Sequence, residues 1–88
     1  MINVYIPSPL RPLTGDQPEI MLEGGTVGEV MENFKAGFPE AAARFFSPRA
    51  ARYLNLYLNE EDVRNLQGMD TPVKDGDELA IVFAVAGG

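Results

Sequence analysis

The chain has 88 residues, enough for one domain over residues 1–88 and too few for two separate hydrophobic cores. It contains neither cysteine nor histidine, which excludes disulfides, thiolate metal ligands, a cysteine nucleophile and the most common general base, and we expect no metal site. The net charge of −6 disfavours nucleic acid as a partner, and no run of apolar residues is long enough to cross a membrane.

The N-terminal residues 2–6 alternate between apolar side chains (Ile2, Val4 and Ile6) and the side chains of Asn3 and Tyr5. Apolar residues at every second position predict a strand with one buried face. These first residues lack the basic segment of a signal peptide, so we expect a soluble, cytoplasmic protein.

Residues 7–17 contain three prolines and predict a loop, because proline cannot donate a hydrogen bond to a neighbouring strand. Ile20 and Leu22 stand two positions apart and predict a second short strand, which ends at the glycine pair Gly24-Gly25. The first two strands are close enough in sequence to form a hairpin.

Residues 26–38 carry the clearest helix signal. Thr26 and Glu29 have the spacing of a capping box, in which both side chains accept hydrogen bonds from backbone N–H groups. We expect Gly37 to end this helix and Pro39 to prevent it from continuing. Apolar residues recur at intervals of three and four and give the helix one apolar face: Val27, Val30, Met31, Phe34 and Phe38.

The middle of the chain predicts shorter elements. Residues 40–46 predict a second helix that depends on packing of Phe45 or Phe46 rather than on helix propensity. Residues 53–58 predict a strand, because leucines alternate there with tyrosine and asparagine. Next come a turn at residues 59–62, the start of a return strand at residues 63–64, and an irregular segment over residues 68–74.

The C-terminal part of the domain completes the fold prediction. Asp75-Gly76-Asp77 predicts a tight turn, followed by a strand in which Leu79, Ile81, Phe83 and Val85 alternate with smaller side chains. A single amphipathic helix must cover one face of a sheet, and the last strand can lie parallel beside the first. We therefore predict an α+β fold, a β-grasp (ubiquitin-like) roll with a mixed four- to five-stranded sheet and one main helix.

The sequence ends with Val85, Ala86, Gly87 and Gly88, directly after the predicted last strand. We expect a flexible tail over about residues 84–88 that can thread a narrow channel, since glycine adopts backbone conformations closed to other residues. Fully extended, residues 85–88 reach about 13 Å. The carboxylate of Gly88 is ionised at neutral pH. Because the chain has no cysteine, covalently carried sulfur would sit on this carboxyl group as a thiocarboxylate.

Four segments together indicate a protein family. Residues 75–83 (Asp-Gly-Asp-Glu and the following strand) and residues 85–88 (Val-Ala-Gly-Gly) resemble the C-terminal signature of the ThiS/MoaD family of ubiquitin-like sulfur carrier proteins. Residues 53–64 and residues 10–15 are similar to the CysO-type branch of that family, which serves cysteine biosynthesis. Phe83 departs from the pattern, because many members have proline there.

The resemblance implies a protein co-substrate, not an enzyme, that binds no cofactor tightly. A ubiquitin-activating-like adenylyltransferase and sulfurtransferase would use ATP to adenylate the carboxylate of Gly88, and a sulfur donor would then displace AMP. The tail, including Val85, Ala86 and Gly87, would enter the active site of an acceptor. In the CysO-type branch this acceptor is a pyridoxal-phosphate (PLP)-dependent cysteine synthase, and a metal-dependent peptidase releases the product.

Three aromatic residues are candidates for a partner-binding surface. If the leucines of residues 53–58 face the helix, Tyr53 and Tyr57 lie on the opposite face of the sheet. Phe83 falls on the same side of the last strand as its other alternating apolar side chains. The sequence therefore allows two positions for Phe83, one in the core and one at the edge of the sheet. Ubiquitin-like sheets dock through the face opposite the helix, so the resemblance favours Tyr57 as a partner contact.

Acidic residues concentrate in the last third of the chain: Glu60, Glu61, Asp62, Asp70, Asp75, Asp77 and Glu78. They predict a solvated face, and the same charges would also steer basic partner enzymes towards the protein.

Three alternatives for the function stay open. One is the small subunit of molybdopterin synthase, whose large subunit would receive the tail and pass the sulfur to a pterin. Another is a ubiquitin-like modifier that is conjugated to lysines through Gly88. The last is an interaction module with an inert glycine tail. The sequence does not separate cysteine, molybdopterin and thiamine pathways.

Overall fold

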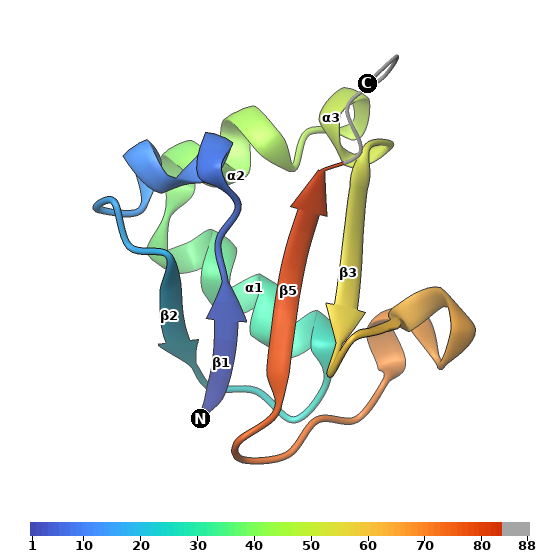
Figure 1. Cartoon of the computed structure of the whole chain (residues 1–88). Helices are drawn as coiled ribbons and strands as arrows, with labels where there is room; N and C mark the ends of the chain where they lie inside the picture. The colour runs from blue at the N-terminus through green and yellow to red at the C-terminus, as the bar shows by residue number, and fades with distance from the viewer. Residues whose placement is uncertain (84–88) are drawn as a thin grey trace.

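The computed structural model describes residues 1–83, which form a mixed sheet and the helices that cover one of its faces (Figure 1). The strands are β1 (Ile2–Tyr5), β2 (Glu19–Leu22), β3 (Leu54–Leu58), β4 (Glu61–Asp62) and β5 (Glu78–Phe83). The helices are α1 (Val27–Gly37), α2 (Pro39–Phe45) and α3 (Pro48–Ala51), with 3₁₀ helices at Ser8–Leu13, Val63–Asn65 and Gly68–Asp70.

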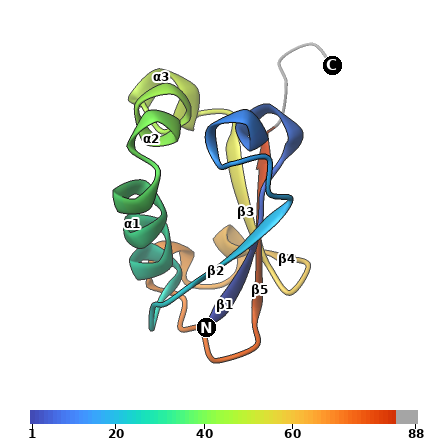
Figure 2. The ribbon, with the colours of Figure 1, turned by 90° about the vertical axis from the view of Figure 1, so that its left-hand side faces the viewer.

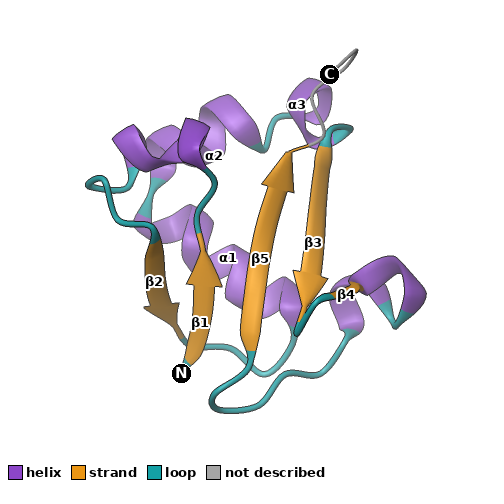
Figure 3. Cartoon of the chain, viewed as in Figure 1, coloured by secondary structure: helices purple, strands orange, loops and turns teal. Residues whose placement is uncertain are grey.

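The sheet has five strands in the order β2-β1-β5-β3-β4 (Figure 3). β1 pairs with β2 antiparallel and with β5 parallel, whereas β3 is antiparallel to both β5 and β4. Within residues 1–83, the α-helices lie on one side of this sheet (Figure 2). The topology confirms the predicted β-grasp roll, including the parallel pairing of the first and last strands.

Both predicted side chains cap the start of α1, but Glu29 contacts the N–H of Gly25, one residue before the Thr26 N–H that a capping box uses. The backbone N–H of Glu29 donates to Thr26 Oγ1 over 3.1 Å, and the Glu29 carboxylate accepts from the N–H of Gly25 over 2.7 Å. Gly24 is required at this entrance, because a Cβ atom there would lie only 2.6 Å from Val30 Cγ2. The cap and this close approach fix where the helix begins against the sheet.

The core lies between α1 and the facing side of the sheet. The predicted apolar face of α1 is confirmed, since Val27, Val30, Met31 and Phe34 are all buried. The Phe34 ring is fully buried and lies 5.3 Å from the ring of Phe38, measured between centroids. The strands contribute the buried side chains Ile2, Val4, Ile20, Leu56, Leu58, Leu79 and Ile81.

The proline-containing segments differ from the prediction. Ser8–Leu13, predicted as loop, is a 3₁₀ helix that buries Leu10 completely. Pro39 does not merely stop α1: it is the first residue of α2, which spans Pro39–Phe45 instead of residues 40–46. α3 was not predicted at all, although Ser47 Oγ accepts from the N–H of Ala50 over 3.3 Å and caps it. Proline fits a first helical turn, where its missing N–H is not needed.

The predicted return strand at residues 63–64 is wrong. The short strand β4 is Glu61–Asp62, within the segment predicted as a turn, and Val63–Asn65 is a 3₁₀ helix. The Asp62 carboxylate caps this helix by accepting from the N–H of Arg64, which diverts the chain out of the sheet. Residues 68–74, predicted as irregular, contain the 3₁₀ helix Gly68–Asp70.

The last predicted strand is confirmed as far as the structure describes it. The described part of β5 reaches Phe83, and its predicted extension to Val85 lies outside the described residues. Across residues 1–83, no helix has both the length and the apolar character needed to span a membrane.

Candidate functional site

The predicted reactive segment Val85, Ala86, Gly87 and Gly88 lies outside the described residues, so its role stays a prediction. The structure does define the strand that leads to it. β5 is the central strand of the sheet, and its last residue, Phe83, pairs with Leu54 of β3. This end of β5 lies at the same end of the sheet as α2 and α3 (Figure 1).

The opposite end of β5 is held by a buried carboxylate. Asp77 is 8% exposed and accepts hydrogen bonds from the N–H of Lys74 over 2.9 Å and from Asn59 Nδ2 over 3.1 Å. These bonds, chiefly the one from Lys74, keep the pKa of Asp77 below its ordinary value although burial acts against this. Asn59 Oδ1 in turn accepts from the N–H of Glu78 over 3.0 Å. The start of β5 is therefore tied to the β3–β4 turn.

The three aromatic candidates do not share one surface. Tyr57 of β3 is half-buried and pairs with Ala80, on the sheet face opposite α1. Phe83 lies on the helix-covered face, where its ring is 5.3 Å from the ring of Phe45. Tyr53 precedes β3, is 39% exposed, and has the Arg52 guanidinium 5.9 Å from its ring centroid. Whether any of them contacts a partner stays a prediction.

The sheet face opposite α1, called the open face below, carries a hollow that the sequence did not reveal. Tyr5 of β1 and Tyr57 of β3 both pair with Ala80, from the two strands that flank β5. Because the side chain of Ala80 is small, a space of about 290 Å³ remains beside the two rings. Glu60 and Glu78 also line this space. We call this site the tyrosine hollow.

Two carboxylates line the tyrosine hollow, and the charge of a third, Glu19, also acts on Tyr5. The Glu78 carboxylate, followed by partial burial and by Glu19, raises the pKa of the Tyr5 hydroxyl above its ordinary value. Two further apolar side chains, Met21 and Val82, are exposed on the open face at 56% and 40%. The alternation of residues 2–6 predicts that Tyr5 lies on the face opposite the core side chains. It does not predict which residues lie beside Tyr5, because these depend on the register between β1 and β5.

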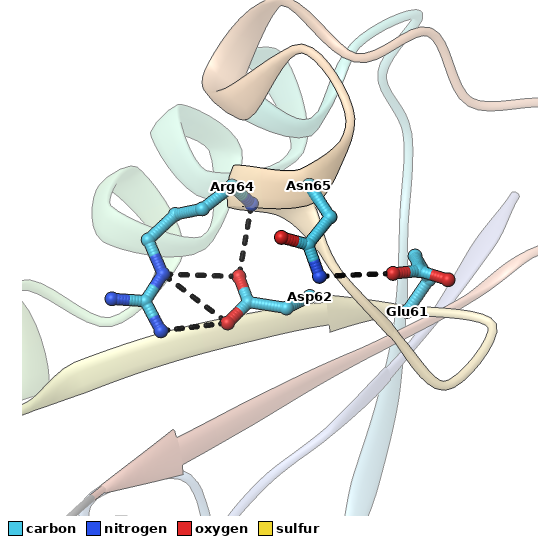
Figure 4. Close-up of polar contacts among 4 residues, drawn as sticks. All are labelled: Glu61, Asp62, Arg64 and Asn65. Atoms are coloured by element: carbon cyan, nitrogen blue, oxygen red, sulfur yellow. Dashed lines mark hydrogen bonds and ion pairs between the residues drawn. The ribbon is translucent and has the colours of Figure 1, made fainter.

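The acidic residues of the last third do not form one uniform solvated face. Asp62 is held by Arg64, whose Nη2 lies 2.7 Å from Asp62 Oδ2 (Figure 4). Hydrogen bonds from Arg64 lower the pKa of Asp62, and the same contact raises the pKa of Arg64. Glu61 accepts from Asn65 Nδ2 over 3.1 Å. With Asp77 buried, several of these carboxylates therefore organise local turns.

The described part of the chain contains no group of three or more carboxylates placed to hold a metal ion. The absence of a tightly bound cofactor stays a prediction.

Sequence comparison relates nearly the whole chain to one family. The profile of the ThiS family matches residues 4–88. The sulfur carrier protein CysO of Mycobacterium tuberculosis is 38% identical over 91 residues, which cover 99% of this chain and 98% of that protein.

Solved structures agree with this relationship. A chain of the BexX/CysO complex from Amycolatopsis orientalis is 38% identical and superposes with a TM-score of 0.86 over the full length of both chains. The small archaeal modifier protein 1 of Methanosarcina acetivorans is 27% identical, with a TM-score of 0.83 over 99% of this chain and 95% of that one. The predicted family resemblance and the predicted fold are both confirmed.

Proposed function

The chain belongs to the ThiS family of sulfur carrier proteins, and on this basis we propose that it carries sulfur on its C-terminal carboxyl group and transfers it to a biosynthetic enzyme. One observation carries the proposal: the family match extends to residue 88, so it includes the terminal pair Gly87-Gly88. The absence of cysteine from the chain leaves that carboxyl group as the place for covalently bound sulfur.

The chemistry requires two steps at Gly88, both performed by a partner. A carboxylate oxygen of Gly88 attacks the α-phosphorus of ATP, pyrophosphate leaves, and the acyl-adenylate makes the carbonyl carbon electrophilic. Hydrosulfide then attacks this carbon and AMP leaves, so that the terminus becomes a thiocarboxylate. Sulfur carriers of this kind are in general not enzymes themselves, and the cycle demands no catalytic side chain from this chain.

We place the protein with carriers for cysteine synthesis, because the relatives with 38% identity are named CysO. The first partner is then an ATP-dependent activating enzyme, and the acceptor is a PLP-dependent cysteine synthase, with a metal-dependent peptidase releasing the product. That the Amycolatopsis CysO forms a complex with BexX supports a role exercised through partner proteins. Molybdopterin synthase remains the alternative acceptor, and the cytoplasmic location stays a prediction.

Intact mass spectrometry tests the proposal. The purified chain is incubated with an activating enzyme, ATP and sulfide, and it should become heavier by the mass difference between sulfur and oxygen. The product should also react with a thiol-directed alkylating reagent. A variant that lacks Gly88 is the matched control and should remain unmodified. If an authentic CysO is converted by its own enzyme while this chain is unchanged by every enzyme from its own cells, the proposal fails.

A second function, protein modification, is favoured by the similarity to small archaeal modifier protein 1. An acyl-adenylate at Gly88 would also react with the amino group of a lysine and form an isopeptide bond. Peptide mapping of proteins from the native cells should then find lysines that carry a Gly-Gly remnant, and these should disappear when the gene is deleted.

A further inference from the structure

The tyrosine hollow combines two kinds of group that attract a cation. Tyr5 and Tyr57 place two aromatic rings on either side of Ala80. An aromatic ring attracts a cation over its face, and arginine is the cation most often found there. Glu60 and Glu78 line the same space, so carboxylate acceptors stand beside the rings. A ligand with a planar cationic group can use both at once.

Two basic side chains of this chain form ion pairs outside the hollow. Arg64 forms its ion pair with Asp62, although its charge also reaches Tyr57. Lys35 on α1 pairs with Glu32, with Nζ 2.7 Å from Oε2. Within residues 1–83, the groups lining the tyrosine hollow are two tyrosines, two glutamates and one alanine, none of them basic. The net charge of −6 adds a long-range attraction for cations.

We propose that the tyrosine hollow binds an arginine side chain of the partner enzyme. The planar guanidinium group stacks on a tyrosine ring and donates hydrogen bonds to a carboxylate, whereas the compact ammonium group of lysine does only the second well. This inference names the chemistry by which the partner of the proposed sulfur carrier recognises it, and therefore rests on that function.

The position of the hollow suits a docking contact that acts together with the tail. Ala80 precedes Phe83, the end of β5, by three residues, or about 10 Å of extended strand. An arginine held at Ala80 would thus fix the partner close to the point from which the tail starts. The exposed Val82 lies between the two on the open face and would come under the same partner surface.

Nuclear magnetic resonance with small probes tests the binding site directly. N-acetyl-arginine amide is added to the full chain, and N-acetyl-citrulline amide serves as the neutral probe of nearly the same shape. The amide signals of Tyr5, Tyr57, Glu78 and Ala80 should shift with the arginine probe and not with citrulline. Equal shifts with both probes, or no shift at these residues, would overturn the inference.

Matched variants separate this inference from the proposed function. In the double variant Glu60→Gln and Glu78→Gln, arginine-induced shifts should vanish, whereas Glu40→Gln at the start of α2 should retain them. With the activating enzyme, the double variant should raise the KM for the carrier by about three- to tenfold, while kcat and the final extent of thiocarboxylate formation stay unchanged.

The two failures look different. If the wild-type chain receives no sulfur from any activating enzyme, the proposed function fails. If the wild-type chain receives sulfur but the double variant has the same KM as Glu40→Gln, only the arginine site fails. Tyr57→Phe keeps the ring and should behave as wild type, whereas Tyr57→Leu should lose arginine-induced shifts.

Discussion

The two faces of the sheet are built from the same strands but differ in how far their side chains are exposed to solvent. On the face towards α1, Val4, Leu79 and Ile81 are almost completely buried. On the open face, their neighbours in sequence Tyr5 and Val82 are 38% and 40% exposed. Because side chains alternate along a strand, adjacent residues contribute to stability and to recognition separately. Substitutions on the open face should therefore change binding without unfolding the domain.

The largest effect should come from the covered face. Phe34→Ala removes a ring that is fully buried and lies 5.5 Å from the ring of Phe46. The lost contacts and the cavity should lower the free energy of unfolding by about 3–5 kcal/mol, measured by urea denaturation. If the loss is below that of an open-face substitution such as Val82→Thr, the contrast between the two faces is wrong.

The buried carboxylate at the start of β5 should have the next largest effect. Asp77→Ala leaves the N–H of Lys74 and the amide of Asn59 without their acceptor and should cost about 1–3 kcal/mol. Asp70→Ala, at an exposed position, is the control and should change stability little.

The same carboxylate predicts a pH dependence. Since the folded protein lowers the pKa of Asp77, its contribution is complete above the ordinary carboxyl pKa of about 4 and is lost as the pH falls through the folded value. The stability difference between wild type and Asp77→Ala, from denaturation at a series of pH values, should shrink over that acidic range. A constant difference would contradict the lowered pKa.

A pair of adjacent substitutions sharpens the comparison within one strand. Val82→Thr on the open face should change the free energy of unfolding by no more than about 0.5 kcal/mol. Ile81→Thr, one residue earlier and 3% exposed, buries a hydroxyl group and should cost about 1–3 kcal/mol. Thermal unfolding of the two variants compares them directly, and similar melting temperatures would argue against the assigned β5 orientation.

The smallest effect concerns the electrostatics of the tyrosine hollow. Glu78→Gln should lower the pKa of Tyr5 towards its ordinary value, because the Glu78 charge is the main cause of the upward shift. Glu19→Gln should lower it less, since Glu19 ranks after both Glu78 and burial. Titration followed by the ring resonances of Tyr5 measures both, and a larger effect from Glu19 would contradict the structure.

The main elements could be predicted from local side-chain patterns. Thr26 and Glu29 define the start of α1 by hydrogen bonds between near neighbours, which sequence spacing reveals. The alternation in β1 and β5 is equally local. The helices that begin at Pro39 and Pro48 were predicted inaccurately or not at all. Proline breaks the interior of a helix but favours its first turn, so its presence alone does not show which applies. Which case applies depends on how the preceding helix packs.

The site was predictable only in part, for a related reason. The Gly-Gly end and the family resemblance can be recognised in short continuous segments of the sequence. The tyrosine hollow instead joins Tyr5 to Ala80, and the buried position of Asp77 depends on Asn59. These contacts join residues far apart in the chain, so they depend on strand register and turn geometry that periodicity does not specify.

The central position of β5 has a mechanical consequence. A pulling force applied beyond Phe83, as by an unfoldase that grips the C-terminus, acts along β5 while β1 and β3 hold it from both sides. Such a load shears several backbone hydrogen bonds at once instead of unzipping them one after another. Residues 1–83 should therefore resist unfolding by a force that is applied beyond Phe83.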